Sequence, residues 1–326
     1  MRCLKSRYKQ NRIEYMRLGV DLGGTKIEAV VLTEQGQAIW RKRVSTPQGH
    51  YERTLIAIKD LVGEAKSKFD LSLHLPIGIG TPGALFYDDK QACFVLRNSN
   101  STALNGRPFF EDLKSLLACE VYLENDANCF ALAEALSGQG REYAKTPASL
   151  FGVILGTGVG GGFVVEQRLV RGRHHISGEW GHNMLPASAL LTLPETERFR
   201  SCYCGSLDCV ETYLSGPGLA NSYFLRFNQH KTTIEIIEEM RQGDVHASII
   251  WEHYLQQLAG ALAQVVNILD PELIVLGGGM SQVEEIYPAL SKKMQSHVFT
   301  DNFSTPILPA KLGDSAGVFG AAWLTP

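Results

Sequence analysis

The chain contains no run of 18 apolar residues, which excludes a conventional transmembrane helix. Residues 1–15 are rich in lysine and arginine, but they lack the apolar stretch of a secretory signal. Excess charge of one sign is also missing, because 31 Lys and Arg against 34 Asp and Glu leave a net charge of −3. We therefore expect a protein of the cytoplasm that binds neither membranes nor nucleic acid.

A disulfide framework is not expected either, because the seven cysteines are odd in number and the chain has cytosolic character. Three of them stand together in CYCGSLDC, residues 202–209. Thiolates this close in sequence usually share one zinc ion with a fourth ligand, and such a closed site is structural. His182 is the candidate fourth ligand, with His174 and His175 as alternatives whose predicted turn indicates exposure to solvent. Three buried cysteines without a metal would give the same pattern.

Glycine, with 32 residues, is the one elevated component, and two glycine-rich turns dominate the chain. They are DLGGTK at 21–26 and LGTGVGGG at 155–162. Each joins two β-branched apolar runs, which predicts a strand, a tight turn and a second strand. Glycine lets backbone N–H groups approach a phosphate closely, so two such turns facing each other would hold a nucleoside triphosphate. Two ordinary β-hairpins would also give this pattern.

A third glycine segment lies in the C-terminal half. Residues 259–269 are apolar at helical spacing and end at Asp270-Pro271, a helix stop. Residues 272–276 then predict a buried parallel strand that ends in GGGMS at 277–281, where nucleotides bind in open α/β sheets. The closing residues 313–322 predict a helix of small residues that can pack closely against another backbone.

Polar residues open a further predicted helix at 129–136, which we expect to be amphipathic. Asn125, Asp126 and Asn128 precede this run, and one of them is expected to be its N-cap. A carboxylate at a helix N-terminus stays ionised, so Asp126 could accept a proton from an attacking hydroxyl while Asn125 positions the substrate. A second polar cluster, residues 98–102, suits either a polyhydroxylated ligand or a solvated loop.

In this order the motifs resemble the ROK family (repressors, open reading frames, kinases), from Met16 to the C-terminus. The two glycine turns are similar to the phosphate motifs of that family, and VLGGGMS at 275–281 is similar to its adenosine motif. GEWGH at 178–182, followed by CYCGSLDCVE at 202–211, is similar to its zinc and sugar motif and is the most specific of the set.

The resemblance implies the two-lobed fold of the actin-like and sugar-kinase ATPases, which is ribonuclease H-like. We expect two α/β lobes, each with a mixed five-stranded sheet flanked by helices, and a cleft between them. Residues 1–15 would be a disordered extension or a mis-assigned start, and residues 16–125 the N-terminal lobe. Residues 126–310 would be the C-terminal lobe with the zinc motif, and residues 311–326 a helix that returns to the N-terminal lobe. The resemblance also implies a homodimer.

The same resemblance implies roles for single residues. Asp126 would be the general base of a sugar kinase that uses ATP and Mg²⁺. The sugar ligands would be Asn100, Asn125, Glu179, His182 and Glu211. The ligands of a structural zinc ion would be His182, Cys202, Cys204 and Cys209. The nucleotide would contact Asp21, Gly23, Gly24, Thr25, Lys26, Gly156, Thr157, Gly158, Gly277, Gly278 and Gly279.

Two positions depart from the family pattern. Asp208 stands where the zinc motif of the family carries a second glycine, and Asp is among the few residues that tolerate a positive φ there. The sugar loop of the family also commonly carries an aromatic residue near the position of Ala103 or Leu104, and this chain has none there.

The segments that bear on the sugar point in two directions. Residues 98–106, 178–183 and 320–324 are most similar to fructokinases of the manno(fructo)kinase type, so we predict phosphorylation of the 6-hydroxyl of fructose. Residues 124–132 are equally similar to N-acetylglucosamine kinases, which makes that sugar or another hexose the alternative. An alternative of another class is a sugar-sensing regulator without catalysis. A repressor of this family would carry an N-terminal helix-turn-helix domain, for which residues 1–15 are too few.

Overall fold

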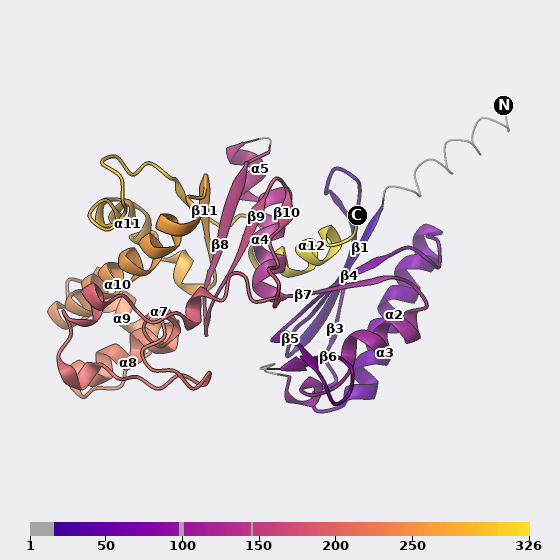
Figure 1. Cartoon of the computed structure of the whole chain (residues 1–326), viewed down its shortest axis with the longest axis horizontal. Helices are drawn as coiled ribbons and strands as arrows, with labels where there is room; N and C mark the ends of the chain where they lie inside the picture. Colours follow the sequence, from indigo (N-terminus) through magenta and orange to yellow (C-terminus); the bar gives the residue numbers. More distant parts are fainter. Residues whose placement is uncertain (1–15, 98–100, 145) are drawn as a thin grey trace.

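A computed structural model describes residues 16–97, 101–144 and 146–326 (Figure 1). The predictions for residues 1–15 and for Asn100 therefore lie outside the described residues. Figure 1 shows two lobes, with α4 and α12 between them. Each lobe contains a mixed five-stranded sheet, so the predicted two-lobed α/β fold is confirmed.

The first sheet has the strand order β3-β2-β1-β4-β7. Its strands are β1 (Arg17–Leu22), β2 (Lys26–Leu32), β3 (Ala38–Ser45), β4 (Ile77–Thr81) and β7 (Val121–Asn125). The helices α2 (Tyr51–Phe69) and α3 (Phe109–Leu117) and the ribbon of β5 (Ala84–Asp88) and β6 (Cys93–Arg97) belong to the same lobe. Strands β1 and β2 pair antiparallel on either side of the first glycine turn, which confirms the predicted hairpin.

The second sheet has the strand order β10-β9-β8-β11-β12. Its strands are β8 (Ser149–Leu155), β9 (Val159–Val165), β10 (Arg168–Leu169), β11 (Leu273–Gly277) and β12 (Ile307–Pro309). The second hairpin is confirmed by the antiparallel pair β8 and β9, and the predicted parallel strand by β11, which is fully buried between β8 and β12.

Helices cover both faces of the second sheet, because alternate side chains of a strand point to opposite sides. On β11, Ile274 and Leu276 pack into the core cluster that contains α10, whereas Leu273 and Val275 pack into the cluster that contains α4. The helices of this lobe are α5 (Gln139–Tyr143), α6 (Ala187–Leu190), α7 (Glu211–Leu214), α8 (Gly216–Phe227), α9 (Thr233–Arg241), α10 (Val245–Leu269) and α11 (Ile286–Met294). The predicted stop of α10 is confirmed at Asp270, which adopts a left-handed conformation with φ 42°.

Helix α4 (Asp126–Leu136) differs from its prediction as an amphipathic helix. Every residue from 127 to 135 is buried, so no face of this stretch is left for solvent. The reason is its position, since α4 packs against β8 and β9 of the second sheet and also against α12 (Ala316–Trp323). A helix that is covered on all sides is mostly apolar all round, and its two buried polar residues, Asn128 and Glu134, are hydrogen-bonded to other parts of the protein.

Helix α12 packs against β1 and β4 of the first sheet. The prediction that this small-residue helix packs closely against another backbone is confirmed at Gly78 of β4, where an added Cβ atom would lie 1.6 Å from the Ala321 carbonyl oxygen. The assignment of domain boundaries at residues 125 and 310 stays a prediction. In the part of the chain that the structure describes, no helix has the length and apolarity needed to cross a bilayer.

We predict that Gly78→Ala lowers the free energy of unfolding by about 3 kcal/mol, the upper end of overpacking effects, because the new methyl group overlaps the α12 backbone. Gly63→Ala is the matched control, since Gly63 is exposed in the middle of α2 with no neighbouring atom within 4 Å. It should raise the same free energy by about 0.5–1 kcal/mol. Urea unfolding followed by circular dichroism measures both, and equal midpoints for Gly78→Ala and the wild type would contradict the packing.

Candidate functional site

The site is built around the point where strand β7 ends and helix α4 begins. Asn125 is the N-cap of α4, and its Oδ1 accepts the backbone N–H of Asn128 at 2.7 Å, which confirms that one residue of this polar group caps the helix. Asp126 follows as the first helical residue, and its Oδ1 accepts the N–H of Ala127 at 2.8 Å. Asp126 keeps surface that solvent can reach at this end of the helix, although protein atoms surround its carboxylate on the other sides.

Two aspartates at the head of the site, Asp21 and Asp126, both have raised pKa values. Burial raises the pKa of Asp126, although hydrogen bonds from the helix backbone oppose the rise. The helix N-terminus and the surrounding protein atoms therefore act on the pKa of Asp126 in opposite directions. That Asp126 is ionised stays a prediction. Burial, followed by the charges of Asp126 and Glu28, raises the pKa of Asp21 to about 7.

Asp21 stands at the end of β1 between two glycine backbones. Added Cβ atoms at Gly80 and Gly317 would lie 3.2 and 2.8 Å from its carboxylate oxygens, so any larger residue would crowd it. A cation beside Asp21 would neutralise the negative charge that gathers there, and Mg²⁺ prefers oxygen ligands. The residues present therefore fit the predicted Mg²⁺, with Asp21 as the carboxylate that would hold it.

Glu179 joins the site from the loop after β10. The Asn125 side-chain amide donates to Glu179 Oε1 at 3.4 Å, which places Glu179 beside the start of α4. Burial raises the pKa of Glu179, and the charges of Asp126 and Glu211 add to the rise. The next residue, Trp180, anchors the turn by donating from its indole nitrogen to the Gly160 carbonyl at 2.9 Å. The predicted sugar ligands Asn125 and Glu179 are thus brought together.

Glu211 connects this group to the second glycine turn. As the first residue of α7, it accepts the backbone N–H of Val159 on its Oε2 at 3.0 Å. The turn itself, residues 156–158, is closed by the Gly156 N–H donating to the Gly158 carbonyl at 2.9 Å, and the Gly156 carbonyl accepts the N–H of Gly216 at 2.8 Å. One hydrogen bond therefore connects the carboxylate of Glu211 to the end of the predicted phosphate-binding turn.

The third glycine segment lies beside the second. Gly277 ends β11, and the Gly278 backbone is so close to β8 that an added Cβ atom would lie 2.4 Å from the Leu155 carbonyl oxygen. The first turn lies on the other sheet, where the Gly23 N–H donates to the Lys26 carbonyl at 2.9 Å and Thr46 Oγ1 donates to the Gly23 carbonyl at 2.7 Å. Gly24 and Thr25 are exposed at its tip.

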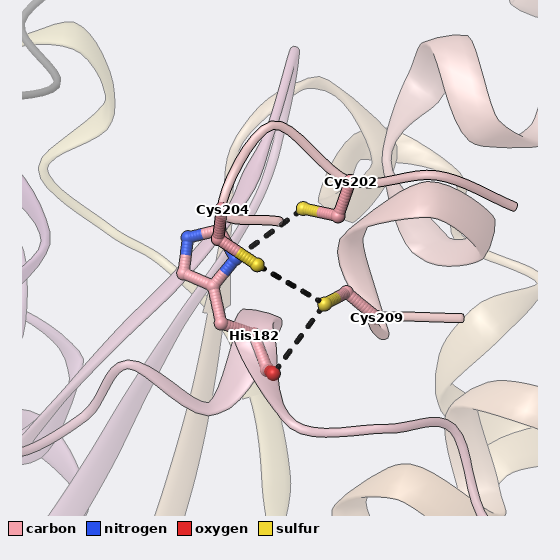
Figure 2. Close-up of side chains that lie close together, drawn as sticks. All are labelled: His182, Cys202, Cys204 and Cys209. Atoms are coloured by element: carbon pink, nitrogen blue, oxygen red, sulfur yellow. Dashed lines mark hydrogen bonds between the residues drawn. The ribbon is translucent and has the colours of Figure 1, made fainter. Parts of the chain in front are cut away.

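The predicted metal ligands form one cluster (Figure 2). The ligand atoms of His182, Cys202, Cys204 and Cys209 all lie within 4.8 Å of one another. Cys204 Sγ is 3.6 Å from Cys209 Sγ, and Cys202 Sγ is 3.6 Å from His182 Nδ1. Zn–S bonds of about 2.3 Å at tetrahedral angles place two sulfurs about 3.8 Å apart, so this donor set fits zinc in both chemistry and spacing. His174 is exposed and His175 stacks edge-on against Phe94.

Comparison with known proteins identifies the family. The model of the ROK family matches residues 17–326. The chain belongs to the ROK family. It is 40% identical over 309 residues to the N-acetyl-D-glucosamine kinase of Citrobacter koseri, an alignment that covers 95% of this chain and 99% of that protein.

Solved ROK structures share the fold. The ROK hexokinase from Thermus thermophilus matches with a TM-score of 0.81 and 29% identity over 95% of this chain and 97% of that chain. The ROK family glucokinase from Streptomyces griseus, solved in complex with glucose and AMPPNP, matches with a TM-score of 0.68 and 29% identity over 95% and 99% of the two chains. The two-lobed fold of this chain is therefore the one found in ROK sugar kinases.

The structure accounts for Asp208, which departs from the ROK zinc motif. Asp208 has a φ of 55°, so this position does adopt the left-handed conformation that Asp is among the few residues to tolerate. Its buried carboxylate also accepts the Arg200 N–H at 2.8 Å and the Tyr213 hydroxyl at 2.6 Å, both on Oδ1. A glycine has no side chain to accept these two hydrogen bonds, so Asp208 holds the loop before Cys209 through contacts that the family's glycine could not make.

Two contacts of this ROK site escaped the sequence analysis. Arg171 donates from Nε to the buried carboxylate of Glu124 at 2.8 Å, one residue before Asn125. Tyr203, which lies between Cys202 and Cys204 in the sequence, has its hydroxyl 3.0 Å from His182 Nε2. Burial and then the charges of Glu211 and Glu179 raise the pKa of Tyr203 to about 12. In each pair the two residues lie far apart in the sequence, so no local pattern marks the contact.

We predict that the purified chain contains about one zinc ion, since four ligands close one tetrahedral site. Cys209→Ser should lose most of this zinc and unfold at a lower temperature, because metal binding stabilises the folded loop. Cys93→Ser is the control, as Cys93 lies in β6 outside the cluster. Metal content by plasma mass spectrometry and thermal unfolding measure the effect. Wild-type protein without zinc after expression in zinc-supplemented medium would contradict the assignment.

Proposed function

We propose that this chain is an ATP-dependent sugar kinase that phosphorylates the 6-hydroxyl of N-acetylglucosamine, with Asp126 as the general base. The observation that carries the proposal is the 40% identity over 309 residues to a kinase of this sugar. The position of Asp126 supports it, since this residue at the head of α4 keeps surface that solvent can reach and lies beside the Asn125–Glu179 pair. Phosphoryl transfer requires mainly positioning and charge neutralisation, which such a site provides.

In the proposed reaction, the 6-hydroxyl oxygen of the sugar bonds to the γ-phosphorus of ATP, and the bond from that phosphorus to the bridging oxygen of ADP breaks. The hydroxyl proton passes to Asp126. A raised pKa strengthens this carboxylate as a base once it is ionised. Bound Mg²⁺ would neutralise charge on the phosphates, and Asp21 is the carboxylate proposed to hold it.

The remaining predicted residues are proposed to bind the two substrates. Asn125, Glu179, His182 and Glu211 are proposed to bind the sugar hydroxyls, together with Asn100 outside the described residues. The second and third glycine segments lie together on one sheet and are proposed to bind the phosphates and adenosine, with the first turn closing from the other sheet. The homodimer and the cytoplasmic location stay predictions.

Fructose remains the second candidate substrate, because the loop at residues 98–106 and the segments at 178–183 and 320–324 favour it. The similarity to the N-acetyl-D-glucosamine kinase weighs against fructose, since it extends over 95% of this chain rather than over three short segments. A sugar sensor without catalysis is disfavoured by the placement of Asp126 and by the two phosphate turns.

We expect the wild-type chain to release ADP fastest with N-acetylglucosamine when it is given ATP, Mg²⁺ and each of four sugars. The comparison sugars are glucose, which lacks only the acetamido group, and fructose and mannose. A value of kcat/KM at least about tenfold higher for N-acetylglucosamine than for glucose would reflect about 1.4 kcal/mol of recognition of that group. A preference for fructose would instead favour the loop-based prediction.

Asp126→Asn should lower kcat by about 10³-fold while the dissociation constant for sugar stays within about twofold, because the amide cannot accept the proton. Its oxygen can still accept the Ala127 N–H, so the helix start is preserved. Asp89→Asn, at an exposed turn, is the charge-matched control and should retain full activity. Steady-state kinetics and isothermal titration calorimetry provide the two readouts. An Asp126→Asn enzyme that keeps wild-type kcat would exclude this residue as the base.

A further inference from the structure

Tyr203 occupies an unusual position for a large aromatic residue. It lies between the two metal-cluster cysteines Cys202 and Cys204, and its side chain is 68% exposed. Its ring meets the ring of His182 edge-on, with centroids 5.1 Å apart and an interplanar angle of 89°. A residue that served only to pack the loop would be expected to bury its ring, because burying aromatic area is what gives packing its stability.

The two nitrogens of His182 face different partners. Nδ1 lies 3.6 Å from Cys202 Sγ, on the side of the metal cluster, and Nε2 lies 3.0 Å from the Tyr203 hydroxyl. When Nδ1 binds a metal, the neutral imidazole carries its proton on Nε2. Nε2 then donates to the phenol oxygen of Tyr203, so the proposed contact of His182 with the sugar runs through this hydroxyl. The Tyr203 hydroxyl can then donate its own hydrogen to a third group. The hydrogen bond that the phenol oxygen accepts from His182 restricts the direction in which this hydrogen points.

The surroundings of Tyr203 indicate what the third group is. His182, Glu179 and Glu211 are the residues proposed to bind sugar hydroxyls, and Tyr203 contacts the first of them directly. The segment proposed to bind sugar from the other lobe has no aromatic residue at Ala103 or Leu104. A tyrosine offers both an apolar ring and a polar tip, the combination that suits a sugar with C–H faces and hydroxyl edges.

We propose that Tyr203 is a sugar-binding residue of this chain, which donates its hydroxyl hydrogen to the substrate and covers it with its ring. The inference rests on the proposed function, because it takes the sugar site to be the one that contains Glu179, His182 and Glu211. It assigns the loop between Cys202 and Cys204 two roles, one toward the metal and one toward the substrate.

Two variants separate the roles of the ring and the hydroxyl. Tyr203→Phe keeps the ring and removes one hydrogen bond, so the dissociation constant for N-acetylglucosamine should rise about threefold. Tyr203→Ala removes both, and the rise should reach about tenfold, which corresponds to about 1.4 kcal/mol. The KM for sugar should follow the same order, whereas the KM for ATP should stay constant. Leu207→Ala, an exposed apolar side chain of the same loop, is the control and should match the wild type.

Binding is measured by calorimetry without ATP, using whichever sugar of the four-sugar panel the wild type binds most tightly, and the zinc content of each variant is measured alongside. A chain that binds sugar without phosphorylating it would refute the proposed function but would still test Tyr203. Sugar affinity within twofold of the wild type in Tyr203→Ala with zinc retained would overturn the inference. Loss of zinc in Tyr203→Phe would also overturn it, because the hydroxyl would then support the metal loop instead.

Discussion

The close stacking of backbones from one sheet to the other is the constraint on which the rest of the structure depends. Strand β4 approaches α12 at Gly78, where an added Cβ atom would lie 1.6 Å from the Ala321 carbonyl oxygen. Helix α12 approaches α4 at Gly320, where an added Cβ atom would lie 1.8 Å from the Cys129 carbonyl oxygen. Strand β8 approaches α4 at Gly152, where an added Cβ atom would lie 2.7 Å from the Ala131 side chain. Each contact excludes any side chain larger than hydrogen, so the layers have one arrangement. Asp21 and Asp126 lie at the ends of stacked elements, which fixes the distance between them.

A buried carboxylate holds the same stack at its far end. Glu134 of α4 has no exposed surface, and it accepts backbone N–H groups from Gln139, Lys311 and Leu312. Several N–H donors can compensate the cost of burying one negative charge. The chain that leads into α12 is thereby tied to α4 before the helix begins. At the other end of α4, the Arg171–Glu124 ion pair connects the loop after β10 to the end of strand β7.

Local patterns in the sequence were sufficient for most elements and for the metal cluster. Both hairpins, strand β11 and the stop of α10 follow from glycine, proline and β-branched residues that act over a few positions. The positive φ of Asp208 could be anticipated for the same local reason. The burial of α4 could not, because what covers it arrives from β8, β9 and α12, all of them later in the chain. The raised pKa of Asp21 depends likewise on Asp126, which is 105 positions away. The preference for one sugar is hardest to predict from sequence patterns, since it depends on the volume of the site and on contacts such as that of Tyr203 with His182.

The return of α12 to the first sheet has a consequence for the order in which this protein can fold during synthesis. Val30 and Leu32 of β2 form a core cluster with Val318 and Ala322, so one face of the first sheet is covered by residues from the last helix. When a ribosome has released the first lobe, that face is still bare, because its cover has not yet been translated. Apolar surface exposed in this way is prone to aggregation and to capture by chaperones. The first lobe is therefore completed last, although its strands are made first.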